Sequence, residues 1–288
     1  MKKLYRKWHA QCINFVVSAL IIFCIFQNGF AQEVPSKEVA LTIDDLPFVG
    51  QTQNDPEKYR REHRRFMEIL ATLKRDQVPA TGFVIAGAIE RDQGEWLKQF
   101  KAADNIIGNH SYSHKSLGRT PVNIYIEDVK KADGVLEPLM SSPKYYRYPY
   151  LSEGFGTEKY DKFRHYLFSN NYVVAPATII SHDTRFNLNL LNIPWQKRKD
   201  YIDTYRHRYL DYVWSQTVKA EKKAEKIVHR PIKQILLIHM NTLNSYFLGD
   251  LITLYHHHGY KFITLPEALT DPYYKNHKEE HPVMGGDK

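Results

Sequence analysis

Short apolar runs alternate with longer amphipathic segments over most of this chain, and this rhythm limits the folds it can adopt. The runs at 39–43 and 235–238 are typical of strands buried on both faces, as in parallel sheets. Asp55 followed by Pro56 predicts a helix start, because apolar residues then recur at helical spacing. Parallel strands need crossover connections, so the sequence predicts an α/β fold.

The expected strands number about seven, which favours a distorted (β/α) barrel over a doubly wound sheet. These strands are 39–43, 80–85, 105–107, 145–146, 172–178, 235–238 and 261–265, with further helices at 94–103, 121–140, 158–171 and 243–258. Residues 185–230 are charged, aromatic and helical in pattern, and predict a helical insertion before the sixth strand. The polar end, 271–288, contains a Gly-Gly pair and predicts a flexible tail.

The amino-terminal segment has the three-part layout of a signal peptide. Basic residues come first, an apolar run follows at 13–26, and the small residues Gly29 and Ala31 precede a cut before Gln32. The alternative is an uncleaved anchor, but the apolar run of ~14 residues is shorter than the ~20 that a span needs. We therefore expect residues 1–31 to be a signal peptide, 32–288 to form one catalytic domain, and the protein to be secreted or periplasmic, without stable membrane insertion after cleavage.

Composition excludes several classes of function. Both cysteines, Cys12 and Cys24, lie in the signal segment, so the remaining chain has no disulfide, zinc-thiolate site or cysteine nucleophile. Residues 1–31 hold four basic residues and no acidic one, so their removal leaves 36 basic and 32 acidic residues and lowers the net charge from +8 to +4. No arginine-rich stripe or groove-reading motif is present, so we expect no nucleic-acid partner. The mean hydropathy of -0.51 excludes a polytopic membrane protein.

Polar side chains follow the expected strands, at the edge where such folds build active sites. They are Asp44, Asp45, His110, His114, Arg147 and His239. Singly, each has an ordinary structural explanation: a solvated turn, a surface helix or a satisfied core histidine. Together they favour a site, because two adjacent buried carboxylates repel and need a cation beside them. A divalent metal held by one carboxylate and two imidazoles leaves positions for water and substrate, and leaves the second carboxylate as a base.

Four segments, in this order along the chain, resemble the first, second, third and fifth motifs of the polysaccharide deacetylases, the NodB-homology enzymes of carbohydrate esterase family four. They are Thr42-Ile43-Asp44-Asp45, His110-Ser111-Tyr112-Ser113-His114, Arg147-Tyr148-Pro149-Tyr150 and Leu237-Ile238-His239. Residues 80–84 also resemble the family's second strand. The resemblance extends from about residue 39 to residue 269.

The resemblance implies a role for each matched residue. Asp45, His110 and His114 would bind one divalent metal ion, usually zinc, with cobalt or nickel as alternatives. Asp44 would act as the base, and Arg147 would pair with it. The Tyr150 backbone N–H would stabilise the oxyanion, His239 would protonate the leaving amine, and Leu237 would line the site of the acetyl methyl group.

The fourth motif departs from the family pattern. The segment Ile180-Ser181-His182-Asp183-Thr184 keeps only the second acid of the usual Asp-x-x-Asp-Trp. The carboxylate that would support His239 is therefore missing or supplied by Asp183, with His182 as the other candidate. Leu46-Pro47 also replaces the usual residues after Asp45, which predicts a differently shaped first loop.

Two other clusters have both a structural and a functional explanation. The tract at 256–258 resembles a metal site, but its place before Gly259 favours a helix carboxyl terminus. Four tyrosines near the third motif could stack on sugar rings, although strand alternation would send about half of them to the core. They are Tyr145, Tyr146, Tyr148 and Tyr150.

The expected function is that of a metal-dependent hydrolase that removes N-acetyl groups from an amino-sugar polysaccharide or oligosaccharide, such as peptidoglycan or chitin. The expected partner is thus a carbohydrate. An O-acetyl esterase of the same fold, acting on a xylan-type polymer, is one alternative. A catalytically inactive carbohydrate-binding relative is the other.

Overall fold

The computed structural model describes residues 37–50, 52, 55–154 and 157–276. The expected signal peptide, residues 1–31, lies outside this range. No helix in the described ranges is long and apolar enough to cross a membrane.

In the described ranges, eight strands form one sheet in which every pairing is parallel. They are β1 (Lys37–Leu46), β2 (Ala80–Val84), β3 (Ile106–Asn109), β4 (Lys144–Tyr146), β5 (Tyr172–Val174), β6 (Ile179–Ile180), β7 (Gln234–His239) and β8 (Tyr260–Ile263). Their order is β5-β4-β3-β2-β1-β7-β6, and β8 pairs with the amino-terminal half of β1. No pairing joins β5 to β6 in the described part of the chain, so the predicted (β/α) barrel is confirmed and is open at that point.

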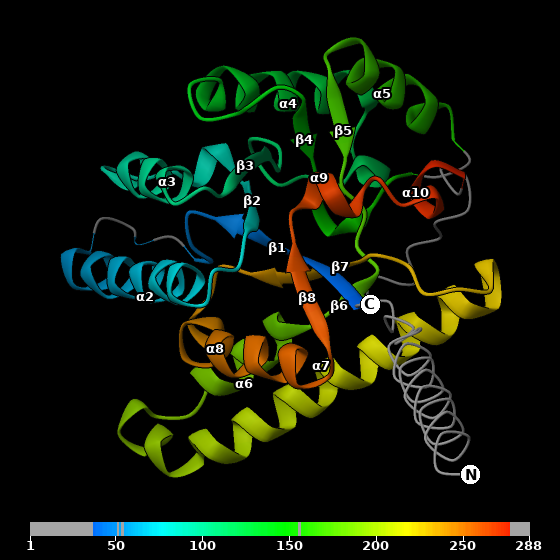
Figure 1. The fold of residues 1–288 in the computed structure, drawn as a ribbon. Coiled ribbons are helices and arrows are strands. Elements are labelled where there is room, and N and C mark those ends of the chain that lie inside the picture. Colours follow the sequence, from blue (N-terminus) through cyan, green and yellow to red (C-terminus); the bar gives the residue numbers. More distant parts are fainter. Residues whose placement is uncertain (1–36, 51, 53–54, 155–156, 277–288) are drawn as a thin grey trace, which may run out of the picture. The chain divides into compact units, whose positions relative to one another are not determined.

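Helices pack around the strands (Figure 1), with α3 and α4 against β3, α5 against β5 and α7 against β6. They are α2 (Pro56–Arg75), α3 (Gln93–Ala102), α4 (Val122–Leu136), α5 (Glu158–Ser169), α6 (Asp183–Leu191), α7 (Arg198–Val228), α8 (Thr242–His257), α9 (Leu265–Ala268) and α10 (Pro272–Asn276). The predicted start of α2 is confirmed, because the Asp55 side chain accepts hydrogen bonds from the backbone N–H groups of Glu57 and Lys58. The His256–His258 tract ends α8, with His258 at its C-cap before Gly259.

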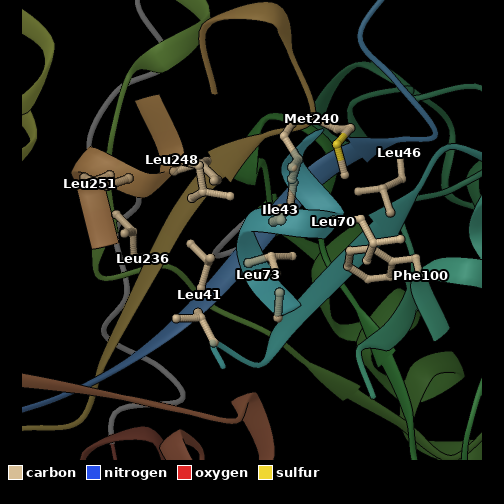
Figure 2. Packing of buried hydrophobic residues seen from close by; sticks show 14 of the residues in the cluster. Leu41, Ile43, Leu46, Leu70, Leu73, Phe100, Leu236, Met240, Leu248 and Leu251 are labelled. Atoms are coloured by element: carbon tan, nitrogen blue, oxygen red, sulfur yellow. The ribbon is translucent and has the colours of Figure 1, made fainter. Parts of the chain in front are cut away.

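The main hydrophobic core lies between the central strands and the helices α2 and α8. Alternate residues of β1, Leu41 and Ile43, meet side chains of α2, β7 and α8 there (Figure 2). Ala40 belongs instead to a second cluster, with α9 and the tyrosines of α10. Because β1 is buried on both sides along almost its whole length, it reads in the sequence as a continuous apolar run.

The structure has one strand more than expected. The sequence predicts a single strand over 172–178. In the structure β5 ends at Val174, and a separate short strand, β6, begins at Ile179. Proline has no backbone N–H and cannot donate to a ladder, so the strand ends before Pro176. The helices α6 and α7 follow β6 and lie in the predicted insertion before β7, the expected sixth strand.

The prediction of a flexible tail from residue 271 is wrong for 271–276. Asp271 is buried and accepts hydrogen bonds from the Arg230 guanidinium at 2.5 and 3.0 Å. In α10 the Tyr274 hydroxyl donates to the Lys233 carbonyl at 2.5 Å. Burial of two tyrosine rings orders this segment despite its polar composition. Residues 277–288 lie outside the described range.

Candidate active site

Asp45 interrupts the end of β1 and brings two adjacent carboxylates to one place. Its φ of 63° is in the left-handed region, and the pairing register with β2 shifts between Ile43 and Leu46. In a regular strand, neighbouring side chains point to opposite faces. The bulge removes this alternation, so both Asp44 and Asp45 lie near the His110 Nε2 atom, at 3.8 and 3.6 Å.

Asp45, His110 and His114 form a group that could hold a metal ion, with one ligand atom from each within 4.8 Å of the others. The Nε2 atom of His114 lies 3.3 Å from Asp45 Oδ1, and that oxygen is buried without a hydrogen-bond partner among the described residues. His110 Nδ1 donates to the Arg147 carbonyl at 2.8 Å, which turns Nε2 toward Asp45. One carboxylate and two imidazoles suit a divalent transition metal such as zinc.

His114 is poised to act as a neutral ligand. Burial, together with the nearby His110 ring, lowers the pKa of His114 to about 4. The imidazole is therefore unprotonated near pH 7, and its lone pair is available to a metal.

Hydrogen bonds to the side chains of Asn109 and of Asp128, on α4, hold the loop that carries the two histidines. Asn109 Oδ1 accepts from Ser111 N at 2.7 Å, and Ser111 Oγ accepts from His114 N at 3.0 Å. The Asp128 carboxylate accepts from the backbone N–H groups of Tyr112 and Ser113, at 3.1 and 3.0 Å. Ser111 and His114 both have positive φ, so these bonds hold a conformation that the chain would not adopt alone.

Asp44 and Arg147 form a buried pair. Arg147 Nη1 lies 3.6 Å from Asp44 Oδ2, and both side chains are almost completely buried. Arg147 is further fixed by Nη2, which donates to Thr42 Oγ1 and to the Pro176 carbonyl. Burial lowers the pKa of Arg147, but the Asp44 charge opposes this, so the guanidinium remains a cation beside the carboxylate.

A second pair joins the partly exposed His239 to the completely buried Asp183. The Nδ1–H of His239 donates to Asp183 Oδ1 at 2.7 Å, and the His239 backbone N–H donates to Oδ2 at 2.8 Å. Burial acts to lower the pKa of His239, but the charge and hydrogen bond of Asp183 outweigh it and raise the pKa to about 10. The structure thus places Asp183 against His239, whereas the His182 ring packs 5.9 Å from Tyr212.

The tyrosines near the third motif divide unequally between core and surface. Tyr145, Tyr146 and Tyr148 are buried, and only Tyr150 of the four is exposed, by 64%. Tyr150 has a φ of 58°, and its ring lies 4.5 Å from that of His114. Tyr150 is therefore the tyrosine of this group that borders the candidate metal site. Leu237 is buried in β7, two strand positions before the pairing of Asp44 with His239.

Sequence reasoning missed the polar residues that support this site from helices. Asp128 accepts a hydrogen bond from the loop that carries His110 and His114. Asn241 and Asn244 donate to the Asp183 carboxylate, and Tyr209 donates to Asn244. Two asparagines three residues apart just after His239 gave the only signal, and it is a weak one. The other two lie on helices whose packing partners are distant in the chain.

Residues 31–164 match the model of a family described as polysaccharide deacetylase. A peptidoglycan-N-acetylglucosamine deacetylase of Bacillus cereus is 32% identical over 126 residues, which are 43% of this chain and 40% of that protein. The chain thus spans less than half of the length of this curated relative. The matched range contains Asp44, Asp45, His110, His114 and Arg147.

Solved structures share the fold at low identity. A polysaccharide deacetylase from Bacillus cereus superposes with a TM-score of 0.56 at 21% identity, covering 79% of this chain and 91% of that one. A peptidoglycan deacetylase from Bacillus subtilis gives 0.54 at 20% identity, covering 87% and 98%. A carbohydrate esterase family four pseudoenzyme from Bacillus anthracis gives 0.55 at 18% identity, covering 82% and 66%.

The fold and the Asp-His-His group define the class of protein: a (β/α) barrel with a candidate metal site at the carboxyl ends of its strands. Within that class, residues 31–164 of this chain are similar to the polysaccharide deacetylases.

Proposed function

We propose that this protein is a metal-dependent hydrolase that removes N-acetyl groups from an amino-sugar polysaccharide or oligosaccharide. The observation that carries the proposal is the presence of two separate pairs, Asp44 with Arg147 and His239 with Asp183, beside one candidate metal group. Amide hydrolysis needs a base to activate water and an acid to protonate the leaving nitrogen.

A divalent metal ion held by Asp45, His110 and His114 would supply Lewis acidity toward the acetyl carbonyl and the attacking water. Zinc is the proposed ion, with cobalt or nickel as alternatives. The backbone N–H of Tyr150 is proposed as a second donor to the oxyanion.

Asp44 is proposed as the base that removes a proton from the attacking water. Its Oδ1 atom is buried and has no hydrogen-bond partner among the described residues, so it is free to accept that proton. Arg147 places a positive charge beside the carboxylate, with its Nη1 atom 3.6 Å from Asp44 Oδ2. Because Thr42 and Pro176 hold the guanidinium in place, Asp44 faces the site in a fixed orientation.

His239 is proposed as the acid. Asp183 accepts the Nδ1 proton of the imidazole, which leaves Nε2–H as the donor to the departing amine. An amine anion is a very poor leaving group, so this proton is required for C–N cleavage. We propose that Asp183 thus supplies the carboxylate that the altered fourth motif left in doubt.

The acid also bears on the two alternatives. An esterase needs less help from an acid, because an alkoxide leaves more readily than an amide nitrogen, and so the charged His239–Asp183 pair favours an N-acetyl substrate. A binding protein needs neither pair. The pseudoenzyme neighbour has the same fold, so it is the side chains that argue for catalysis.

The proposed cellular setting follows from the substrate. A polymer of the cell wall or of the surroundings would require export, which agrees with the signal peptide expected at residues 1–31. The proposed substrate class is consistent with the Bacillus cereus relative, whose name specifies peptidoglycan N-acetylglucosamine.

The test is acetate release by zinc-loaded protein from peptidoglycan, chitin oligomers and acetylated xylan. We expect release from at least one N-acetylated polymer, its loss on chelation, and its return when zinc or cobalt is added. Asp44→Asn is the matched inactive variant, and we expect a loss of about 100-fold or more with metal retained. Release from acetylated xylan alone would favour the esterase, and release from no polymer would overturn the proposal.

A further inference from the structure

Helix α7 contributes the side chain of Tyr209 to the buried surroundings of Asp183. Tyr209 is completely buried, and its hydroxyl donates to Asn244 Oδ1 of α8 at 2.9 Å. Its ring packs against Phe186 of α6 and Phe247 of α8, with centroid distances of 5.5 and 6.5 Å. Tyr209 thus contacts the two helices that begin next to Asp183 and His239.

Asn244 connects Tyr209 to the acid pair. Its Nδ2 group donates to Asp183 Oδ2 at 2.6 Å and to the His239 carbonyl at 2.8 Å. An amide side chain has one accepting end and one donating end. The nitrogen faces two groups that can only accept, the carboxylate and the carbonyl, so the oxygen is left for the Tyr209 hydroxyl, whose donated hydrogen bond helps to hold the amide in this orientation. Rotation of the amide by half a turn would set its oxygen against Asp183 and replace a hydrogen bond by repulsion.

The Asp183 carboxylate is fixed on all sides by such bonds. Its Oδ2 atom accepts from His239 N, Asn241 Nδ2 and Asn244 Nδ2, which leaves Oδ1 for the His239 ring. Small rotations of the carboxylate would lengthen the bond of 2.7 Å to the imidazole. Its orientation therefore depends on the asparagine donors, and one of these depends on Tyr209.

We propose that Tyr209 of the inserted helix α7 is a positioning residue for the acid His239, acting through Asn244 and Asp183. This inference rests on the proposed function, because it assigns to the insertion a part in the proposed acid step. The other explanation is that the Tyr209 hydroxyl is merely satisfied in the core. Both explanations predict some loss of stability, so stability does not separate them.

The chain offers a matched control at the same pair of helices. The Tyr255 hydroxyl of α8 and the Thr217 hydroxyl of α7 lie 2.6 Å apart, and both side chains are completely buried. Tyr255→Phe removes one buried hydroxyl between α7 and α8, as Tyr209→Phe does. Neither Tyr255 nor Thr217 bonds to Asp183, Asn244 or His239 in the described contacts.

The first experiment compares amide and ester hydrolysis by the full chain loaded with zinc. For Tyr209→Phe we expect kcat/KM on an N-acetylated oligomer to fall about fivefold relative to Tyr255→Phe, the equivalent of about one hydrogen bond. On p-nitrophenyl acetate, whose leaving group hardly needs a proton, we expect the two variants to be alike. Equal effects of both variants on the amide would overturn the proposal.

The second experiment requires no activity and so separates this proposal from the proposed function. A histidine Nδ1–H bonded to a carboxylate gives a strongly downfield proton resonance, which the His239→Ala variant identifies by its loss. We expect Tyr209→Phe to shift this resonance upfield and to speed its exchange with water, and Tyr255→Phe to leave it unchanged. An unchanged resonance in Tyr209→Phe would overturn the positioning role. A shifted resonance in a protein that releases no acetate would instead contradict only the proposed function.

Discussion

At the scale of single residues, the candidate site contains backbone conformations that residues with a Cβ atom rarely adopt. Asp45, Ser111, His114, Tyr150 and His182 all have positive φ, although none is a glycine. Each such residue costs about 1–3 kcal/mol, and such residues persist only where the surroundings determine them. Here the benefit is local: the conformation at Asp45 lets adjacent residues serve one site, and that at His114 turns its ring toward Asp45.

The first prediction concerns the metal ligands. His110→Ala removes one of the three ligands in the described group, and two remaining side chains hold a divalent ion poorly. We expect metal content after dialysis to fall well below one ion per chain, with an unchanged circular dichroism spectrum. His165→Ala, at an exposed position of α5, is the control and should retain the ion. Elemental analysis that finds a full equivalent in His110→Ala would refute the assignment.

The second prediction concerns the charge on His239. Burial alone would lower the pKa of this imidazole, and Asp183 raises it to about 10. Asp183→Asn removes the charge, so the folded-state pKa falls and the proton donor is lost at a lower pH. The alkaline limb of kcat/KM on an N-acetylated oligomer should therefore move to lower pH.

The control for this change is Asp250→Asn, which removes a partly exposed carboxylate of α8 that pairs with Arg206. Its pH profile should match that of the wild type. If the Asp183→Asn profile also matches in shape and maximum, then Asp183 has no part in tuning the acid.

At the scale of elements, the loop after β3 depends on helix α4 for its shape. The Asp128 carboxylate accepts hydrogen bonds from two backbone N–H groups and from the Ser113 hydroxyl, the last at 2.5 Å. A carboxylate has two oxygens that accept hydrogen bonds, whereas an amide has one accepting oxygen and one NH₂ group that donates. Helix α4 thus supports the candidate metal site, although it contributes none of the three residues of the Asp-His-His group.

The third prediction follows from this contact. Asp128→Asn should weaken zinc binding about tenfold, because it loosens the loop that orients His110 and His114. Competition with a chromophoric chelator measures the affinity. Glu127→Gln, at the adjacent exposed position that pairs with Lys130, is the matched control and should bind zinc like the wild type. Equal affinities of the two variants would show that the loop holds its shape without Asp128.

The elements that the sequence predicted well are those whose signal is local. Strands β1 and β7 are buried on both faces and therefore appear as apolar runs. Asp55 and Pro56 predict the start of α2, because aspartate is a common N-cap and proline is common at the first helical position. Strand β6 has only two residues and exists because it pairs with Leu236 and Leu237, far along the chain. Such a strand has no local signal.

The same distinction applies to the site. Asp44, Asp45, His110 and His239 could be found because each lies at or next to the carboxyl end of a strand, and these ends converge at one edge. Asp183 was ambiguous, because the fourth motif lacks its usual neighbours. Tyr209 could not be found at all, since its contact with Asn244 depends on how α7 packs against α8.

At the scale of the whole molecule, the end of the described chain is fastened to the segment that leads into β7. Asp271, just before α10, accepts from both terminal nitrogens of Arg230 and from the backbone N–H groups of Lys233 and Tyr273. Lys233 in turn forms an ion pair with Glu38 of β1, with 3.3 Å between Nζ and Oε2. One buried carboxylate thus ties the last helix to the start of the central strands.

The fourth prediction tests this tie by its dependence on pH. Burial acts to raise the pKa of Asp271, but the hydrogen bonds from Arg230, Tyr273 and Lys233 outweigh it and hold the pKa below the ordinary value of 3.8. A depressed folded-state pKa stabilises the fold above the unfolded value, and this contribution is lost as the pH falls through the folded one. Asp271→Asn should therefore lower the free energy of unfolding at pH 7 by about 1–3 kcal/mol, since it leaves buried donors poorly satisfied.

Thermal unfolding at pH 7 and at a series of pH values that extends well below 3.8, through the folded-state pKa, measures this difference. For a unit of this size, each 1 kcal/mol corresponds to about 2–4 °C in Tm, so the effect is within reach of calorimetry. The gap in Tm between Asp271→Asn and the wild type should narrow at the lower pH, because the wild-type carboxyl then becomes protonated. Asp250→Asn provides the comparison, with a smaller loss expected from its longer and more exposed pair. A gap that is absent at pH 7, or equally wide at both pH values, would mean that the Asp271 charge does not hold α10 in place.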